Sequence, residues 1–433
     1  MRIFLASLFF TVTLFAQSSM ILPDDHERTI KAADSPSIDA FGRWRVSDPF
    51  TLFDSKQLSD SLPLFWQDSL TSGAGATSAY VSNQAATKMN VAATTAGSRT
   101  RQTYMRFNYQ PGKSQLILLT FGELNSKAGI TKSVGYFDDN NGILLKSRND
   151  SLFVVRRTYV TGAAVDNEVH QDDWNLDVLD GSGVSAVTLD MTKTQIFFID
   201  LEWLGVGRVR CGFVVDGKIY YVHEFNNANS LATVYMSTPN LPLRYRIEND
   251  GTATADSMYH ICSSVVSEGG KQENGTLRYK STAGTHVDAT TENTVYAVLG
   301  FRLKSDHLDT IVKMVGLALQ MQTASDKCEW VLIFNPAVAG SPSWAAETNS
   351  AIETFTGATA NTVTGGYTIT GGFLETGSPA AGGANSVFGT LQNAIHLGST
   401  IGGVPDIIVL AVRPIAGSTA IDVEGAITWR ELN

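Results

Sequence analysis

The sequence predicts an all-β protein with two β-sandwich domains of the jelly-roll type and an irregular N-terminal arm. Strand-like runs separated by turn residues recur about every 10 to 15 residues, a spacing typical of sandwiches and jelly rolls. Glycine is abundant, at 38 residues, and only 17% of residues are charged, against about a quarter in an average globular protein. A length of 433 residues is too great for one ordinary sandwich and predicts more than one domain.

Residues 1–19 have two interpretations. Met1 and Arg2 precede an apolar run at residues 3–16, which is the pattern of a signal peptide. The run is too short for a permanent transmembrane helix. The alternative is that translation starts at Met20 and that the first 19 residues are a misannotated start. No later segment is long and apolar enough to predict a membrane span.

Residues 20–99 are expected to form the N-terminal arm and a lead-in to the first domain. Residues 20–70 carry aromatic side chains without a clear period, so we expect an arm that packs these rings onto the next domain or a neighbouring subunit. The aromatic residues are Phe41, Trp44, Phe50, Phe53, Phe65 and Trp66. Residues 71–99 are mostly Ala, Thr, Ser and Gly and predict short edge strands or a loop.

Residues 100–268 are expected to form the first sandwich, because strand signals are dense there. Asn141-Gly142, between strands at 133–137 and 143–146, predicts a type I′ hairpin turn. Asp216-Gly217 predicts a second hairpin, between strands at 209–215 and 218–225. Further strands are expected at 102–109, 116–119, 151–157, 195–203, 243–247 and 258–266.

Residues 271–433 are expected to form the second sandwich, since Gly269-Gly270 interrupts the strand pattern. The strands are expected at 295–303, 310–321, 328–334, 367–373, 406–412 and 421–429. The segment 307–321 fits a helical face as well as a strand face, but Gly316 and the β-rich surroundings favour a strand. Residues 335–366 and 374–403 are rich in small residues and predict long loops.

The charge and cysteine content exclude several classes of protein. The net charge of −10, from 32 basic and 42 acidic residues, gives no electrostatic footprint for nucleic acid. Short basic groups are interpreted as outward strand positions; they are Arg99, Arg101 and Arg106, then Arg156 and Arg157, then Arg244 and Arg246. The cysteines, Cys211, Cys262 and Cys328, form no disulfide framework, and buried free thiols are favoured over a Cys211–Cys262 bridge.

Two acidic stretches are candidate ligand sites. Asp172 and Asp173 precede Trp174, and an acidic loop beside an aromatic ring is one form of sugar-binding site, although a solvated loop with one anchoring Trp explains the pattern too. Asp138, Asp139 and Asn140 could hold Ca²⁺, which prefers oxygen ligands, but the spacing is not that of an EF-hand and a hairpin turn explains it. The histidines show no i, i+2 or i, i+4 pairing, so zinc is not predicted, and no cofactor is expected.

Asp200 and Glu202 form the best catalytic-looking pair. On a strand their side chains share one face about 7 Å apart, which is a usable separation for the two carboxylates of a glycosidase. The third carboxylate often found nearby in such enzymes is missing. We therefore expect a polar outer strand face, and a protein that is not an enzyme.

Several stretches resemble known families. LEWLGVGRVR at 201–210, GFVVDG at 212–217 and HEF at 223–225 resemble the strand–turn–strand units of concanavalin-A-like lectin and laminin-G jelly rolls. The chain from FGRWRVS at 41–47 to WREL at 429–432 resembles uncharacterised virion structural proteins of tailed phages, with RQTYMRFNYQPGKS at 101–114 and WVLIFNP at 330–336 carrying the likeness.

These resemblances imply fold and location more than a reaction. They imply a phage virion structural protein, a tail or surface component such as a capsid decoration, that oligomerises, most plausibly as a trimer, with other virion proteins and contacts host glycans. A signal peptide does not fit this interpretation, so the alternative of a secreted bacterial carbohydrate-binding protein or adhesin stays open. A glycoside-cleaving enzyme is the third hypothesis.

Overall fold

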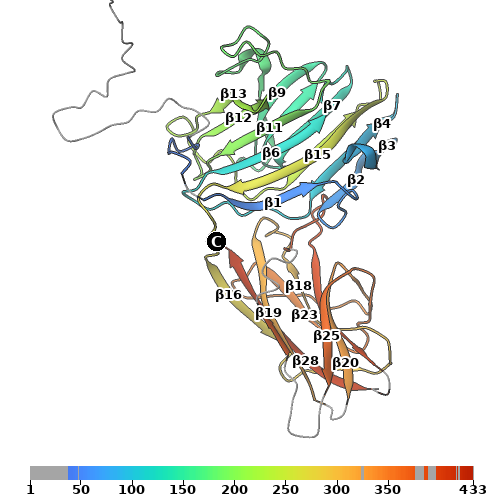
Figure 1. Ribbon diagram of the computed structural model, residues 1–433. Helices are drawn as coiled ribbons and strands as arrows, with labels where there is room; N and C mark the ends of the chain where they lie inside the picture. Colours follow the sequence, from blue (N-terminus) through green and yellow to red (C-terminus); the bar gives the residue numbers. More distant parts are fainter. Residues whose placement is uncertain are drawn as a thin grey trace, which may run out of the picture.

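The computed structural model describes residues 38–46, 48–322, 326–375, 385–388, 396–415, 417 and 420–432. The two interpretations of residues 1–19 lie outside the described residues. Figure 1 shows two β-sandwiches, a larger one built from β1 to β15 and a smaller one built from β16 to β28. The prediction of an all-β chain with two sandwich domains is confirmed. No helix among the described residues is long and apolar enough to cross a membrane.

The first sandwich contains fifteen strands and two short 3-10 helices, η1 (Ser82–Gln84) and η2 (Gln171–Asp173). The strands are β1 (Phe50–Lys56), β2 (Trp66–Gly73), β3 (Ala76–Val81), β4 (Ala86–Val91), β5 (Gly97–Thr103), β6 (Gln115–Gly122), β7 (Ile130–Phe137), β8 (Gly142–Arg148), β9 (Ser151–Thr158), β10 (Val165–His170), β11 (Gln195–Leu201), β12 (Val209–Val215), β13 (Lys218–Phe225), β14 (Leu243–Asn249) and β15 (Asp256–Ser267).

These strands form two sheets that pack face to face. The eight-stranded sheet has the order β13-β12-β11-β6-β15-β4-β3, with β1 also paired to β15. The seven-stranded sheet has the order β10-β9-β8-β7-β14-β5-β2. All pairs within them are antiparallel, and each strand alternates inward and outward side chains.

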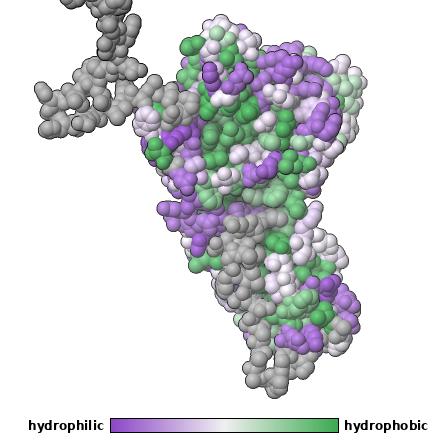
Figure 2. Space-filling view, in the orientation of Figure 1, coloured by the Kyte–Doolittle hydropathy of each residue, from purple (hydrophilic) through white to green (hydrophobic). Residues whose placement is uncertain are grey.

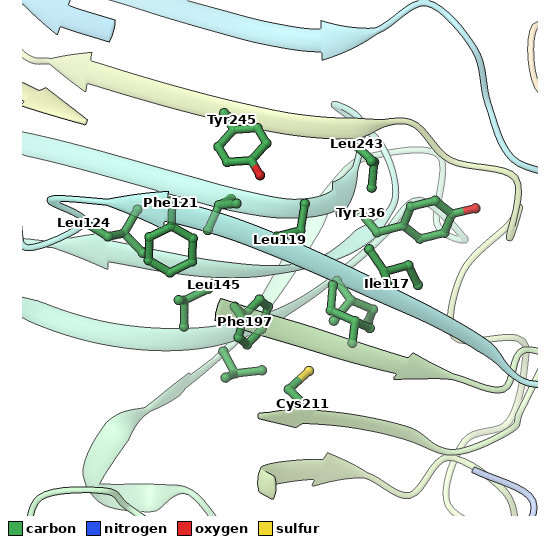
Figure 3. Close-up of a cluster of buried hydrophobic side chains, with 14 of the residues drawn as sticks. Ile117, Leu119, Phe121, Leu124, Tyr136, Leu145, Phe197, Cys211, Leu243 and Tyr245 are labelled. Carbon is green, nitrogen blue, oxygen red and sulfur yellow. The ribbon is translucent and has the colours of Figure 1, made fainter. Parts of the chain in front are cut away.

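The core lies between the two sheets. Ile117, Leu119 and Phe121 of β6 point inward and are fully buried, as are Phe197 of β11 and Tyr245 of β14. Figure 3 shows these side chains meeting between the layers. The strict alternation along β6 explains why its sequence reads as a strand, since one face has to leave water.

Residues 50–99 belong to this sandwich, whereas the sequence suggested an arm and lead-in up to residue 99. The strands β1, β3 and β4 join the eight-stranded sheet, and β2 and β5 join the other. Their apolar signal is weak because the inward positions include polar groups. Arg101 of β5 points into the sandwich, where it is almost fully buried and hydrogen-bonded to His260 Nδ1 at 2.9 Å. Its outward placement was therefore wrong.

The two hairpin predictions have different outcomes. The Asp216-Gly217 hairpin is confirmed, with positive φ angles of 51° and 74°, as a type I′ turn requires. The other hairpin exists, but its turn is Asp138–Asn141 and Gly142 already pairs with Phe137 in the ladder. The type I′ assignment at Asn141-Gly142 was wrong because the Asp138 side chain accepts hydrogen bonds from the N–H groups of Asn140 and Asn141 and closes a longer loop.

The second sandwich packs a five-stranded sheet, β16-β28-β19-β26 with β17 on β28, against a six-stranded one, β22-β23-β18-β27-β20-β25. Its strands are β16 (Gly275–Ser281), β17 (Val287–Ala289), β18 (Tyr296–Leu303), β19 (Ile311–Met321), β20 (Lys327–Phe334), β21 (Ala337–Val338), β22 (Ala345–Ala346), β23 (Ile352–Thr356), β24 (Val363–Thr364), β25 (Tyr367–Glu375), β26 (Asn385–Phe388), β27 (Ile407–Pro414) and β28 (Ile421–Leu432).

Within the ambiguous segment at 307–321, residues 311–321 form a strand, as predicted, because β19 pairs with β28 along its whole length, and residues 307–310 precede that strand. The expected loop at 335–366 contains the short strands β21 to β24, and much of the expected loop at 374–403 lies outside the described residues. The three cysteines are free, as favoured. The sandwiches touch directly: Asn240 Nδ2 donates to the Asp309 carbonyl at 3.0 Å and the Ser399 N–H donates to the Tyr104 carbonyl at 3.2 Å.

Candidate ligand-binding face

The outer face of the seven-stranded sheet carries a dense set of charged side chains, which we call the charged face. Alternation along the strands brings these side chains to one side of the sheet. Its cations are Lys146, Arg148, Arg157, Arg244 and Arg246, and its anions are Asp139, Asp166, Glu168 and Glu248. The opposite outer face, on the eight-stranded sheet, has hydrophobic residues gathered in its middle (Figure 2), among them Leu118, Ile196 and Ile219.

The ion pairs of β8, β9 and β10 form a continuous ladder across the charged face. Lys146 Nζ lies 2.7 Å from Asp166 and 2.8 Å from Glu168, and Arg148 lies 2.7 Å from the same Glu168. Arg157 pairs with Asp166 at 2.7 Å. Burial acts to raise the pKa of Asp166, but hydrogen bonds from Arg157 and Lys146 outweigh it and lower that pKa to about 2. Each side chain therefore holds its neighbour in a fixed position.

A second group of contacts surrounds Phe137 at the turn end of the face. Arg244 pairs with Asp139 and donates to Gln102 Oε1 at 2.7 Å. The guanidinium carbons of Arg244 and Arg157 lie 5.4 and 5.8 Å from the Phe137 ring centroid, within reach of a cation–π interaction. Phe137 is buried below them, so the guanidinium groups cover its ring.

The opposite end of the face presents an aromatic edge. Phe153 of β9 and His170 of β10 contact edge to face, with ring centroids 5.2 Å apart, and the Arg148 guanidinium carbon lies 5.2 Å from the Phe153 centroid. The Arg148 side chain is 41% exposed and that of His170 is 36% exposed. This edge is where charged groups and a partly exposed ring meet solvent together.

The sugar-site candidates lie beside this edge, but Trp174 itself is buried. Asp172 and Asp173 form η2 directly after β10, and an Asp172 oxygen lies 3.5 Å from His170 Nδ1. Trp174 packs in the core near Phe213, with ring centroids 6.4 Å apart, and its Nε1–H donates to the Val169 carbonyl at 3.3 Å. The ring anchors the loop to the core, while Asp172 and Asp173 stay exposed.

The calcium candidates form the β7–β8 turn. Asp138 accepts two backbone N–H groups of that turn and pairs with Arg106 at 2.8 Å. Burial acts to raise its pKa, but Arg106 and the Asn141 N–H outweigh burial and lower it. Asp139 pairs with Arg244, and Asn140 is exposed at the tip of the turn. The Asp138 and Asp139 carboxylates thus have protein partners, and calcium binding stays a prediction.

The catalytic-looking pair lies on the other sheet, under the N-terminal segment 38–46. Asp200 is fully buried and accepts hydrogen bonds from Arg210 at 2.6 Å, Ser114 at 2.7 Å and Arg45. Glu202 is partly buried, which raises its pKa, and its backbone N–H bonds the Arg208 carbonyl. Asp200 therefore forms the centre of a buried ion cluster.

The charged face escaped the sequence reasoning because its members come from five stretches of the chain. One signal was present: charges alternate with period two at 146 and 148, at 166, 168 and 170, and at 244, 246 and 248. The outward placement of Arg244 and Arg246 is correct, whereas Arg156 packs over the Phe225 ring at 5.3 Å. Sequence alone could not supply the register that joins these stretches.

No family model and no curated protein matches the chain. Among solved structures, it is similar to the carbohydrate recognition domain of Emp47p at 8% identity and a TM-score of 0.31, covering 50% of this chain and 95% of that one. A protein of unknown function from Shewanella oneidensis matches at 10% identity and a TM-score of 0.32, covering 57% and 100%. A structure from work on mucin-degrading endo-acting O-glycanases of the human gut microbiota matches at 13% sequence identity and a TM-score of 0.32. The match covers 50% of this chain and 99% of that one. Likeness at this level carries no argument about activity.

Proposed function

We propose that this chain is a non-catalytic glycan-binding protein and that the charged face is its contact surface. One observation carries the proposal: charged donors and acceptors alternate over the outer face of β8, β9 and β10, held by their own ion pairs, with a partly exposed aromatic ring at one end. Sugar hydroxyl groups both donate and accept hydrogen bonds, so such an array complements them.

The fixed geometry of the array favours binding. Lys146 and Arg157 are held by two carboxylates, so a ligand does not have to order these long side chains itself. Phe153 supplies the apolar surface against which the C–H face of a sugar ring can pack. The remaining hydrogen-bonding capacity of Arg148 and His170 points to the Phe153 end as the place of contact.

The chemistry of the carboxylates favours binding over cleavage. Glycoside hydrolysis needs one protonated carboxyl group and a second carboxylate within reach of the same bond. Asp166 has a pKa lowered to about 2 and is a poor proton donor at neutral pH. Asp200 is enclosed by its cations and has no exposed surface. Both features support a protein that binds glycans without changing them.

The test compares the chain with two matched variants on a glycan array, followed by titration calorimetry with the strongest ligand. Arg148→Ala removes a 41%-exposed cation of the charged face, paired with Glu168. Arg413→Ala removes a 41%-exposed cation of the second sandwich, paired with Glu329, and serves as the control. We expect Arg148→Ala to weaken binding about 10-fold, from about 1–2 kcal/mol of lost charged hydrogen bonding, and Arg413→Ala to leave it unchanged.

An array without any bound glycan would contradict the proposed function. Equal binding by the wild type and Arg148→Ala would leave a glycan-binding protein but remove the Phe153 end of the charged face as its site. Reducing sugar released during incubation would contradict the non-catalytic part. These three outcomes can be told apart because each has its own readout on the same protein: the array, the titration and the sugar assay.

For location we propose the virion surface, with secretion as the alternative. The phage resemblance of residues 41–432 supports the first, and the signal-like residues 1–19 support the second. Host glycans on a cell surface are ligands suited to either setting. The oligomeric state separates them, because virion components assemble as repeated symmetric copies.

A further inference from the structure

The second sandwich brings together three metal-ligating side chains that no sequence spacing revealed. Asp288 of β17 and Asp422 of β28 are direct partners in the antiparallel ladder. Their neighbours Val287, Ala289 and Val423 point into the core, so both carboxylates point outward on the same side. His286, two residues before Asp288, joins them.

The ligand atoms of these side chains converge. His286 Nε2 lies 3.2 Å from an Asp288 oxygen and 3.9 Å from an Asp422 oxygen, and all three ligand atoms lie within 4.8 Å of one another. A divalent transition metal bound at about 2.1 Å from each atom needs them about 3 to 4 Å apart, so movements of less than about 1 Å would close the site. Among the described residues, these three side chains are the group of metal-ligating side chains whose ligand atoms converge in this way.

The ladder places two carboxylates side by side at this point of the sheet. Two carboxylates directly opposite on neighbouring strands repel each other. A cation bound between the two carboxylates would offset this repulsion.

We propose that His286, Asp288 and Asp422 bind a divalent transition metal ion, with Zn²⁺ or Mn²⁺ as the class of ligand. One imidazole with two carboxylates suits these ions better than Ca²⁺, which takes oxygen ligands only and more of them. The three side chains leave coordination positions for water. The metal would fasten the three-residue strand β17 to the N-terminal end of β28. The C-terminal end of β28 lies beside the first sandwich, so the metal site is at the far end of the second sandwich (Figure 1).

The experiment uses the full chain, isothermal titration with ZnCl₂ and MnCl₂, and thermal unfolding with and without each metal. Manganese is included because it binds thiols poorly, so Cys262 cannot account for its signal. We expect one site per chain and a metal-dependent rise in Tm. His286→Ala should weaken binding on the order of 10-fold or more and should remove most of the rise in Tm.

His307→Ala is the matched control, because His307 is similarly exposed, at 46% against 44%, and lies 2.7 Å from a single carboxylate, Asp306. It should bind metal like the wild type. A wild type that binds neither ion would overturn the proposal. So would a His286→Ala variant that is folded by circular dichroism and binds as tightly as the wild type, or a His307→Ala variant that loses binding equally.

Discussion

At the scale of single residues, the first sandwich stands out for the charges it buries. Lys132 has no exposed side-chain surface, and its ammonium group donates to the carbonyls of Glu123 and Asn125 and lies 3.1 Å from Asp256. Asp200 is enclosed by Arg45 and Arg210. Such groups are tolerated because every one is paired, and removing a single partner would leave a costly buried charge.

Glu268 gives this cluster a pH dependence with a definite sign. Burial raises its pKa from 4.5 to about 7, although Arg45 acts to lower it. The folded state therefore holds a proton that the unfolded state has lost between these values. The stability contributed by this group is complete below about pH 4.5 and decreases as the pH rises to about 7.

We predict that Glu268→Gln flattens this part of the stability curve. Between pH 4.5 and 8, the wild type should lose about 2 kcal/mol more than the variant, with solvent screening allowed for. Urea unfolding followed by tryptophan fluorescence at several pH values measures the difference. Parallel curves for the two proteins would mean that Glu268 titrates near its ordinary pKa in the folded state.

At the scale of elements, the hairpins show which local signals determine structure. The hairpin at Asp216-Gly217 was predictable because Asp and Gly readily adopt the positive φ that both turn positions have, and because the flanking strands alternate. Gly142 has a different role: a Cβ atom there would lie 2.0 Å from Phe137 Cβ, inside the ladder. The close contact between neighbouring strands, rather than turn geometry, requires this glycine.

We predict that Gly142→Ala is much more damaging than Gly217→Ala. Gly217 has open space around it, so alanine costs only the backbone strain of a positive φ, about 1–2 kcal/mol. Alanine at 142 adds a clash that shifts Phe137 and the ion pairs above it, and should cost about 3 kcal/mol or more. Urea midpoints of the two variants decide; equal midpoints would show that the β7–β8 ladder adjusts freely.

Strands with a strict apolar alternation were predictable, and strands with polar inward positions were not. β11 matches its expected position within two residues, and β6 contains the expected run 116–119 and extends three residues beyond it. In β5 the inward Arg99 pairs with Asp68 of β2, so the hydrophobic pattern on which the prediction depends is missing. The candidate site shows the same limit: Asp172 and Asp173 were found as local signals, while Lys146 and Glu168 meet only through strand register.

At the scale of the whole molecule, the proposed virion location makes a prediction about mass. Size exclusion with light scattering on the full chain should give a stable trimer or a larger ring, since a virion protein works as symmetric copies. A monomer at micromolar concentration would favour the secreted glycan-binding protein.

The pairing of β1 with β15 has a consequence for how the chain folds. β1 is the first strand of the first sandwich, and among the described residues it pairs only with β15, the last strand of that sandwich. A ribosome adding about 5–20 residues per second needs roughly 10–40 s to synthesise the roughly 200 residues between β1 and β15. During that time β1 exposes a free edge, and the high contact order of this closure predicts slow folding that competes with aggregation. A chaperone that holds the nascent chain until β15 has left the ribosome should therefore raise the yield of folded protein.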